Sequence, residues 1–95
     1  MSAYIIVDIV VHDPERYEEY KRLAGPTVGQ YEGRYVVRGG HAENLEGGWA
    51  PNRVVVVEFP TLERAKEWWD SPEYAPAKAI RQAAAKTEMI VVQGA

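Results

Sequence analysis

Three short stretches of the chain are mostly hydrophobic and rich in β-branched and aromatic residues, a pattern typical of β-strands. Residues 4–11 read YIIVDIVV, residues 34–38 read RYVVR and residues 53–59 read RVVVVEF. In each stretch one face is wholly apolar or aromatic, and the other mixes apolar residues with isolated charges. We therefore predict three strands at these positions and a fourth, short strand over residues 89–92.

A helix is predicted between the first two strands. Asp13 is a capping residue, and Pro14 suits the first helical position because it lacks a backbone N–H. The apolar residues that follow recur at helical spacing. Gly25-Pro26 predicts a break in this helix, followed by a short second segment over residues 26–32 with Gly33 as its C-terminal cap.

A second helical region follows the third strand. Thr61 predicts the start of a helix that runs to about residue 70, and Ser71-Pro72 predicts a restart. The apolar stripe of the second segment consists of Ala77, Ile80 and Ala84. Trp68 and Trp69 point about 100° apart on the first segment. One of them should fill the core, and the other is free to reach a neighbour or a pocket.

The predicted order is β-α-β-β-α-β, so we expect residues 1–95 to form a single α+β domain of the ferredoxin-like class. This plan is a four-stranded antiparallel sheet with both helices on one face. The wholly apolar faces should lie under the helices: Ile5, Val7, Ile9, Tyr35, Val37, Val55, Val57 and Phe59.

The other face of the predicted sheet remains apolar enough to need a cover. It carries Ile6, Val10, Val36, Val54 and Val56. Burying five such side chains contributes about 10 kcal/mol before costs, which is comparable with the cost of association, estimated at about 4–15 kcal/mol. The simplest cover is a second copy of the same sheet. We therefore expect a homodimer that forms a dimeric α/β barrel.

Composition narrows the possible partners and compartments. The net charge of −3 does not favour a polyanion, and Glu58 on the open face of its strand would repel a phosphate backbone, so we expect no nucleic-acid partner. The first apolar run is too short to span a bilayer, so no membrane association is expected. The absence of cysteine excludes disulfides and thiolate metal sites and is compatible with a cytoplasmic protein.

Strand alternation places several charged residues on the face of the predicted sheet that points away from the helices. These are Asp8, Arg38 and Glu58, with Arg34 nearer the start of its strand. These residues form either a structural network of ion pairs or a site that binds a ligand and transfers protons. In a site, the arginines would bind an anionic ligand while Asp8 or Glu58, with a raised pKa, would transfer protons.

The long loop over residues 39–52 adds further candidates. Loops of this length in a small domain are usually functional or disordered. His41 is either an acid–base group or a solvated loop residue, because imidazole titrates near neutrality. Trp49 either closes over a pocket or fills the dimer interface, and Tyr74, outside the loop, either donates to a ligand or packs. No spacing of histidines indicates a metal site.

Several segments resemble one family of small bacterial proteins, the domain-of-unknown-function family numbered thirteen-thirty. They are YEGRYVVRGG at 31–40, LEG at 45–47, RVVVVEF at 53–59, Trp68 with SPEY at 71–74, and Arg81. The family is similar to the dimeric α/β-barrel superfamily, which includes cofactor-independent oxygenases, lactone isomerases and haem-dependent enzymes. A haem-ligating histidine would be expected on a helix or strand lining the barrel. His41 is predicted to lie in a loop, so we expect no cofactor.

Two classes of function are compatible with this pattern. The first is a cofactor-independent enzyme that acts on a small anionic or phenolic metabolite in a cleft between sheet and helices. Its reaction would be proton transfer, isomerisation or oxygenase-like chemistry. The second is a non-catalytic dimeric protein that binds a small ligand or serves as an accessory.

Overall fold

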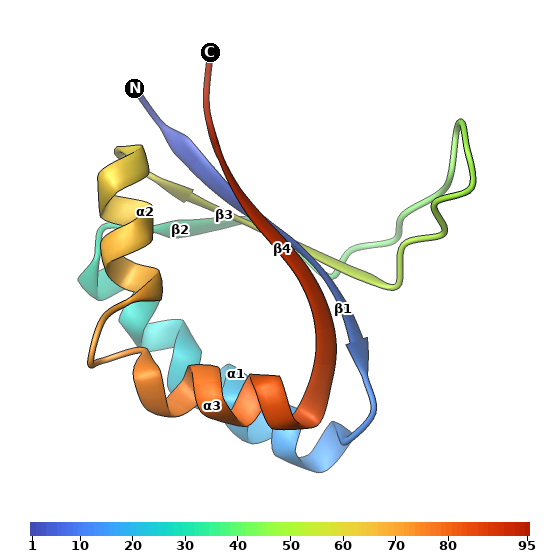
Figure 1. Ribbon diagram of the computed structural model, residues 1–95, viewed down its shortest axis with the longest axis horizontal. Coiled ribbons are helices and arrows are strands. Elements are labelled where there is room, and N and C mark those ends of the chain that lie inside the picture. The colour runs from blue at the N-terminus through green and yellow to red at the C-terminus, as the bar shows by residue number, and fades with distance from the viewer.

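The structure, a computed structural model, describes residues 1–95 and has four strands and three helices. In chain order they are β1 (Ala3–Val11), α1 (Pro14–Gln30), β2 (Arg34–Arg38), β3 (Arg53–Phe59), α2 (Leu62–Trp69), α3 (Ala75–Ala84) and β4 (Ala85–Gln93). The strands form one antiparallel sheet in the order β2-β3-β1-β4. All three helices lie on the same side of this curved sheet (Figure 1). The predicted ferredoxin-like fold is confirmed.

Helix α1 begins as predicted but is not interrupted. The Asp13 carboxylate accepts a hydrogen bond from the Arg16 N–H at 3.2 Å. The helix then continues through Pro26 to Gln30, so the predicted break is wrong. An internal proline costs roughly 3 kcal/mol. The buried face of α1 extends across it to Thr27 and Val28, and we attribute the continuity of the helix to this packing.

The end of α1 is formed by Glu32 rather than by a capping Gly33. Glu32 has a positive φ of 65°, and its N–H bonds the Gly29 carbonyl at 3.0 Å. The Gly33 N–H bonds the Val28 carbonyl at 2.9 Å, which completes a Schellman motif. Gly33 is needed for another reason. A Cβ there would lie 2.6 Å from a ring carbon of Phe59.

The second helical region starts as predicted but restarts later. The Thr61 hydroxyl accepts from the Arg64 N–H at 3.0 Å and caps α2. Ser71 begins a turn, because its hydroxyl donates to the Trp68 carbonyl at 2.7 Å and accepts from the Tyr74 N–H at 3.1 Å. Helix α3 therefore starts at Ala75 rather than at Ser71.

The last strand is longer than predicted. β4 follows α3 without a loop and pairs with β1 along its whole length, from Val11↔Ala85 to Ala3↔Gln93. Its N-terminal half, AKTE, lacks the β-branched run that marks residues 89–92. Pairing with β1, rather than local propensity, defines this part of the strand.

The core lies between the sheet and the helices. Six of the eight residues predicted there are buried: Ile5, Val7, Ile9, Val55, Val57 and Phe59. The Trp68 ring stacks on Tyr74 with 4.0 Å between centroids and lies 5.5 Å from the Phe59 ring centroid. The Trp68 Nε1–H donates to the Thr27 hydroxyl at 3.0 Å, so the buried indole N–H is satisfied.

A bulge in β2 changes which residues face the helices. Tyr35 pairs with Val57, but the next pair is Val37↔Val56, so one residue between them is surplus. Arg38 then pairs with Val55, whose side chain is buried under the helices. One surplus residue inverts the alternation of side chains along the strand. Val37 therefore lies on the face of the sheet that points away from the helices, which we call the open face, and Arg38 lies on the helix side. The predictions that Val37 would face the helices and that Arg38 would face away from them are therefore both wrong.

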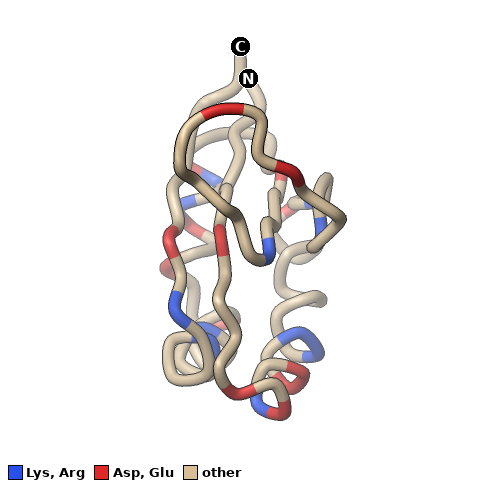
Figure 2. Tube along the Cα trace, turned by 90° about the vertical axis from the view of Figure 1, so that its right-hand side faces the viewer, with Lys and Arg blue, Asp and Glu red and all other residues tan.

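No helix covers the open face of the sheet, the face that points away from α1, α2 and α3 (Figure 1). Its exposed apolar residues include Val10, Val37, Ile90 and Val92. Acidic and basic residues are interspersed along the trace (Figure 2). The loop over residues 39–52 extends away from the body of the domain (Figure 1). None of the helices is both long enough and apolar enough to cross a membrane.

Candidate functional site

The structure does not bring the seven predicted site residues together. Four of them lie on or over the open face of the sheet: Asp8, Arg34, Trp49 and Glu58. Arg38 and Tyr74 lie on the helix side. The His41 side chain is 82% exposed in the loop, where it contacts the Glu43 carboxylate at 3.2 Å. No group of three or more His, Asp or Glu side chains is placed to share a metal ion.

Glu58 is engaged by neighbours on the open face. Its carboxylate accepts from Arg34 Nε at 2.6 Å and from the Tyr4 hydroxyl at 3.2 Å. The hydrogen bond from Arg34 is the main reason that the pKa of Glu58 is lowered. Glu58 is therefore ionised at neutral pH and does not have the raised pKa predicted for a proton-transfer group.

Asp8 anchors the long loop. Its carboxylate accepts from Trp49 Nε1–H and from the Asn52 backbone N–H, both at 3.0 Å. The Trp49 hydrogen bond is the main cause of a lowered pKa at Asp8, so the raised pKa predicted here is also wrong. Trp49 thus lies over the open face, where it lines a cavity of about 230 Å³ with Asp8 and Glu88.

A small cavity of about 30 Å³ lies between the sheet and α1, and we call it the basic pocket. Three cationic side chains line it, together with three tyrosines, but no carboxylate. The cations are Lys21, Arg38 and Arg53, and the tyrosines are Tyr17, Tyr20 and Tyr35. Ile5, Val7, Ile9, Val55, Val57, Trp68 and Met89 complete the wall.

The arginines of the basic pocket interact with aromatic rings rather than with carboxylates. The Arg38 guanidinium lies 4.1 Å from the Tyr35 ring centroid, and Arg53 Nε donates to the Tyr17 hydroxyl at 3.3 Å. Neither arginine forms an ion pair, whereas Lys21 pairs with Glu18 at 2.9 Å. The pocket therefore presents many donors, and its side-chain acceptors are the phenol oxygens and the weakly accepting Met89 sulfur.

A hydrogen-bond chain that is buried at Arg81 and Tyr74 and partly buried at Tyr20 reaches the basic pocket from α3. Arg81 is only 3% exposed, and its Nε donates to the Tyr74 hydroxyl at 3.2 Å. Its Nη1 donates to the Thr87 hydroxyl at 2.9 Å. The Tyr74 hydroxyl in turn lies 3.0 Å from the Tyr20 hydroxyl. Burial is the main reason that the pKa of Tyr20 is strongly raised, so this phenol stays protonated.

Sequence reasoning did not assign Arg81 or Tyr20 to a site. One signal for Arg81 was available, because it occupies the buried stripe of α3 with Ala77 and Ala84. A charged residue at an apolar helical position is either paired or functional. Tyr20 carried no such signal, since a tyrosine on the buried face of a helix is usually a packing residue.

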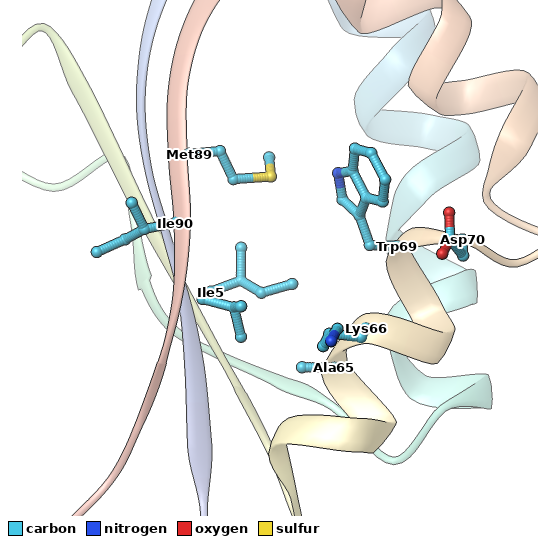
Figure 3. Close-up of a pocket in the computed structure, with 8 residues that line it drawn as sticks. Ile5, Ala65, Lys66, Trp69, Asp70, Met89 and Ile90 are labelled. Atoms are coloured by element: carbon cyan, nitrogen blue, oxygen red, sulfur yellow. The ribbon is translucent and has the colours of Figure 1, made fainter.

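An apolar pocket of about 210 Å³ lies between α2 and β4 (Figure 3). Trp69 from α2 and Met89 from β4 flank this space, and Ile5 points into it (Figure 3). The pocket shares Ile5 and Met89 with the basic pocket, so these side chains form a common wall. Trp69 lines the pocket while Trp68 is buried. This arrangement agrees with the prediction that one of the two adjacent tryptophans fills the core and leaves the other free to reach a pocket. The Lys78 ammonium lies 3.8 Å from the Trp69 ring centroid.

Comparisons with solved structures show the same fold at low sequence identity. A protein of unknown function from Rhodopseudomonas palustris has a TM-score of 0.81 and 21% identity, over 99% of this chain and 82% of that chain. SnoaB, a cofactor-independent oxygenase from Streptomyces nogalater, has a TM-score of 0.70 and 13% identity, over 99% and 93%. A dimeric ferredoxin-like protein of unknown function from Jannaschia sp. CCS1 has a TM-score of 0.72 and 11% identity, over 99% and 100%.

Sequence comparisons place the chain in a family without assigning an activity. None of the curated proteins matches it significantly. One family profile, described as a domain of unknown function, matches almost the whole chain, residues 2–95. The chain therefore belongs to the DUF1330 family.

Proposed function

We propose that this protein binds a small anionic or phenolic molecule in the cleft between the sheet and the helices. The observation that carries this proposal is the lining of the basic pocket, which has two arginines without carboxylate partners and no carboxylate of its own. A ligand oxygen with negative charge would satisfy these donors. Arg38 is the expected anchor, because its guanidinium can form a bidentate contact.

The apolar pocket suits the rest of such a ligand. An apolar cavity of about 150 Å³ can hold benzene, so 210 Å³ offers room for a ring system. Met89 lies between the two pockets and is unbranched, so it can turn aside at low cost. We propose that the oxygen of the ligand lies in the basic pocket and its ring beside Trp69.

The proposed catalytic role is stabilisation of the ligand's anion. Arginine and phenol donors favour the deprotonated form of a phenol or enol, which can then isomerise or react as an electron-rich species without a cofactor. The shared fold with SnoaB, described as a cofactor-independent oxygenase, is compatible with this role. The second candidate is binding without turnover. It is favoured by the absence of histidine and carboxylate from the basic pocket, which leaves the protein no evident base there.

We also propose that two copies pair through their open sheet faces. Uncovered apolar residues on this face support the proposal, with Ile90 59% and Val92 43% exposed. The structurally similar Jannaschia protein is described as dimeric. Pairing would place Asp8, Arg34, Trp49 and Glu58 at or near the interface, where their contacts would be structural.

The experiment is a ligand screen by thermal shift with benzoates, hydroxybenzoates, naphthols and nitrophenols. Wild type should gain thermal stability with at least one of these, and Arg38→Met should lose the gain. Arg34→Met is the matched control, because it removes the same group from the same strand on the opposite face. Hits that survive in Arg38→Met, or are lost equally in Arg34→Met, would contradict the proposed site. Mass spectrometry of each hit after aerobic incubation with the protein then separates turnover from binding.

A further inference from the structure

The Tyr74 hydroxyl has only one way to place its proton. Tyr74 is fully buried, at 0% exposure. One partner of its oxygen is Arg81 Nε–H at 3.2 Å, and a guanidinium donates but never accepts. The other partner is the Tyr20 oxygen at 3.0 Å. Because a buried O–H needs an acceptor, Tyr74 must donate to Tyr20.

This direction determines what Tyr20 can do. Since Tyr20 accepts from Tyr74, it cannot donate its own proton back along the same bond. No carbonyl or carboxylate accepts that proton elsewhere in the structure, and the Tyr20 side chain lines the basic pocket. The Tyr20 O–H therefore has no acceptor within the protein, and the basic pocket is the space that its side chain lines.

We infer that Tyr20 is a specificity-determining donor to an oxyanion of the bound ligand, and that Arg81 is a positioning residue that acts through Tyr74. This inference rests on the proposed function, because it selects carboxylates and phenolates among the possible ligands. Neutral apolar rings would offer no acceptor to the Tyr20 O–H or to Arg38, and would leave Arg53 with the Tyr17 hydroxyl as its acceptor.

The positive charge of Arg81 favours donation from Tyr74 to Tyr20. Arg81 is buried without a carboxylate partner, and its Nη1 contact with the Thr87 hydroxyl at 2.9 Å holds the guanidinium in place. A hydroxyl that accepts from a cation becomes a stronger donor, and the effect passes along the chain from Tyr74 to Tyr20. An oxyanion at the end of the chain would balance the buried positive charge.

The test uses 4-nitrophenolate as the probe, at one fixed pH at which the free probe is ionised. Affinity is measured by calorimetry, and the absorption maximum of the bound probe reports hydrogen bonding to its oxygen. Tyr20→Phe should weaken binding about tenfold or more, since a hydrogen bond to a charged group is lost. It should also move the absorption maximum to longer wavelength. Tyr31→Phe is the control, because its hydroxyl contacts Glu73 on the surface.

Tyr74→Phe tests the relay without removing the packing of the ring. It should weaken binding and shift the spectrum in the same direction as Tyr20→Phe, and the double variant should bind no more weakly than Tyr20→Phe alone. Arg81→Gln should give the same spectral shift as Tyr74→Phe. If Arg81→Gln fails to fold, the isosteric Tyr74→Phe still decides the question.

The outcomes separate this inference from the proposed function. Binding that depends on Arg38 but is unchanged by Tyr20→Phe would overturn the inference alone. A spectrum unmoved by Tyr74→Phe would overturn the positioning role of Arg81 through Tyr74. Failure of the wild-type protein to bind the probe and every other anion in the screen would overturn the proposed function and the inference with it.

Discussion

Arg38 and Glu58 lie on neighbouring strands of one hairpin but project from opposite faces of the sheet. Glu58 pairs with Arg34, and Arg38 pairs with Val55, three residues before Glu58. Regular alternation would have put Arg38 and Glu58 on the same face. The surplus residue between Tyr35 and Val37 separates them, and it assigns the arginine to the helix side and the carboxylate to the open face.

This separation predicts independent effects on ligand binding. Arg38→Met should reduce the affinity for 4-nitrophenolate about tenfold or more, because a charged hydrogen-bond donor is lost. Glu58→Gln should leave the affinity within about twofold, since the two side chains share no partner. Calorimetric titration of both variants and of the double variant checks this. Strong coupling between the two substitutions would place them in one site.

The open sheet face predicts a dimer that a single charge can separate. Val56 pairs with Ile6 near the middle of this face. Val56→Asp should convert the dimer to monomers, because it would bury an unpaired carboxylate in the interface. Light scattering at micromolar concentration should then give a mass of 10.7 kDa. Gln82→Glu on the exposed side of α3 is the control. A monomeric wild type would contradict the barrel arrangement, and a dimer that survives Val56→Asp would contradict the choice of face.

Three adjacent residues on β3 should differ in their contributions to stability. Phe59 is 1% exposed, and Phe59→Ala should lower the free energy of unfolding by about 3–5 kcal/mol. Val57→Ala should cost less, because it removes a smaller buried volume. Glu58→Gln should cost least, since the Arg34 side chain that pairs with it is 73% exposed. Urea unfolding monitored by tryptophan fluorescence ranks the three, and a largest loss for Glu58→Gln would reverse this assignment.

Two glycines at the end of α1 should respond in opposite ways to alanine. A Cβ at Gly33 would lie 2.6 Å from the Phe59 ring, so Gly33→Ala must displace a core side chain and should destabilise the fold. Nothing lies within 4 Å of a Cβ at Gly29, so Gly29→Ala should stabilise by about 0.4–1 kcal/mol. Thermal unfolding of both variants tests the contrast. Equal effects would mean that Gly33 does not pack against Phe59.

The Asp8–Trp49 contact predicts a specific acid dependence. The pKa of Asp8 is lowered in the folded protein, first by the Trp49 hydrogen bond. Asp8 therefore contributes stability above its unfolded pKa of about 3.9, and this contribution is lost as the pH falls through the lower folded value. Trp49→Phe should flatten the rise of unfolding free energy between about pH 2 and 5. Trp69→Phe should not, and an unchanged slope in Trp49→Phe would show that the loop is not anchored at Asp8.

Local patterns in the sequence were sufficient for the elements and for most of the core. Short runs of β-branched residues identified β1 and β3, and alternation along these strands correctly predicted their buried faces, because the strand period of two holds wherever pairing is regular. Asp13 and Thr61 marked the helix starts, since a capping hydrogen bond involves only residues three apart. The order of elements then limited the topology to a ferredoxin-like sheet.

The candidate site depends on relationships that only the tertiary structure provides. The β2 bulge reverses the orientation of Arg38, and a bulge is a property of a pair of strands that one strand's alternation does not reveal. The hydrogen-bond chain joins Tyr20 on α1 to Arg81 on α3 through Tyr74, which lies in the turn before α3. These residues meet only when α1 packs beside α3. Helix α1 likewise continues through Pro26, which local propensity alone would not predict. In each case the deciding contact joins residues distant in the chain, so local pattern could not reveal it.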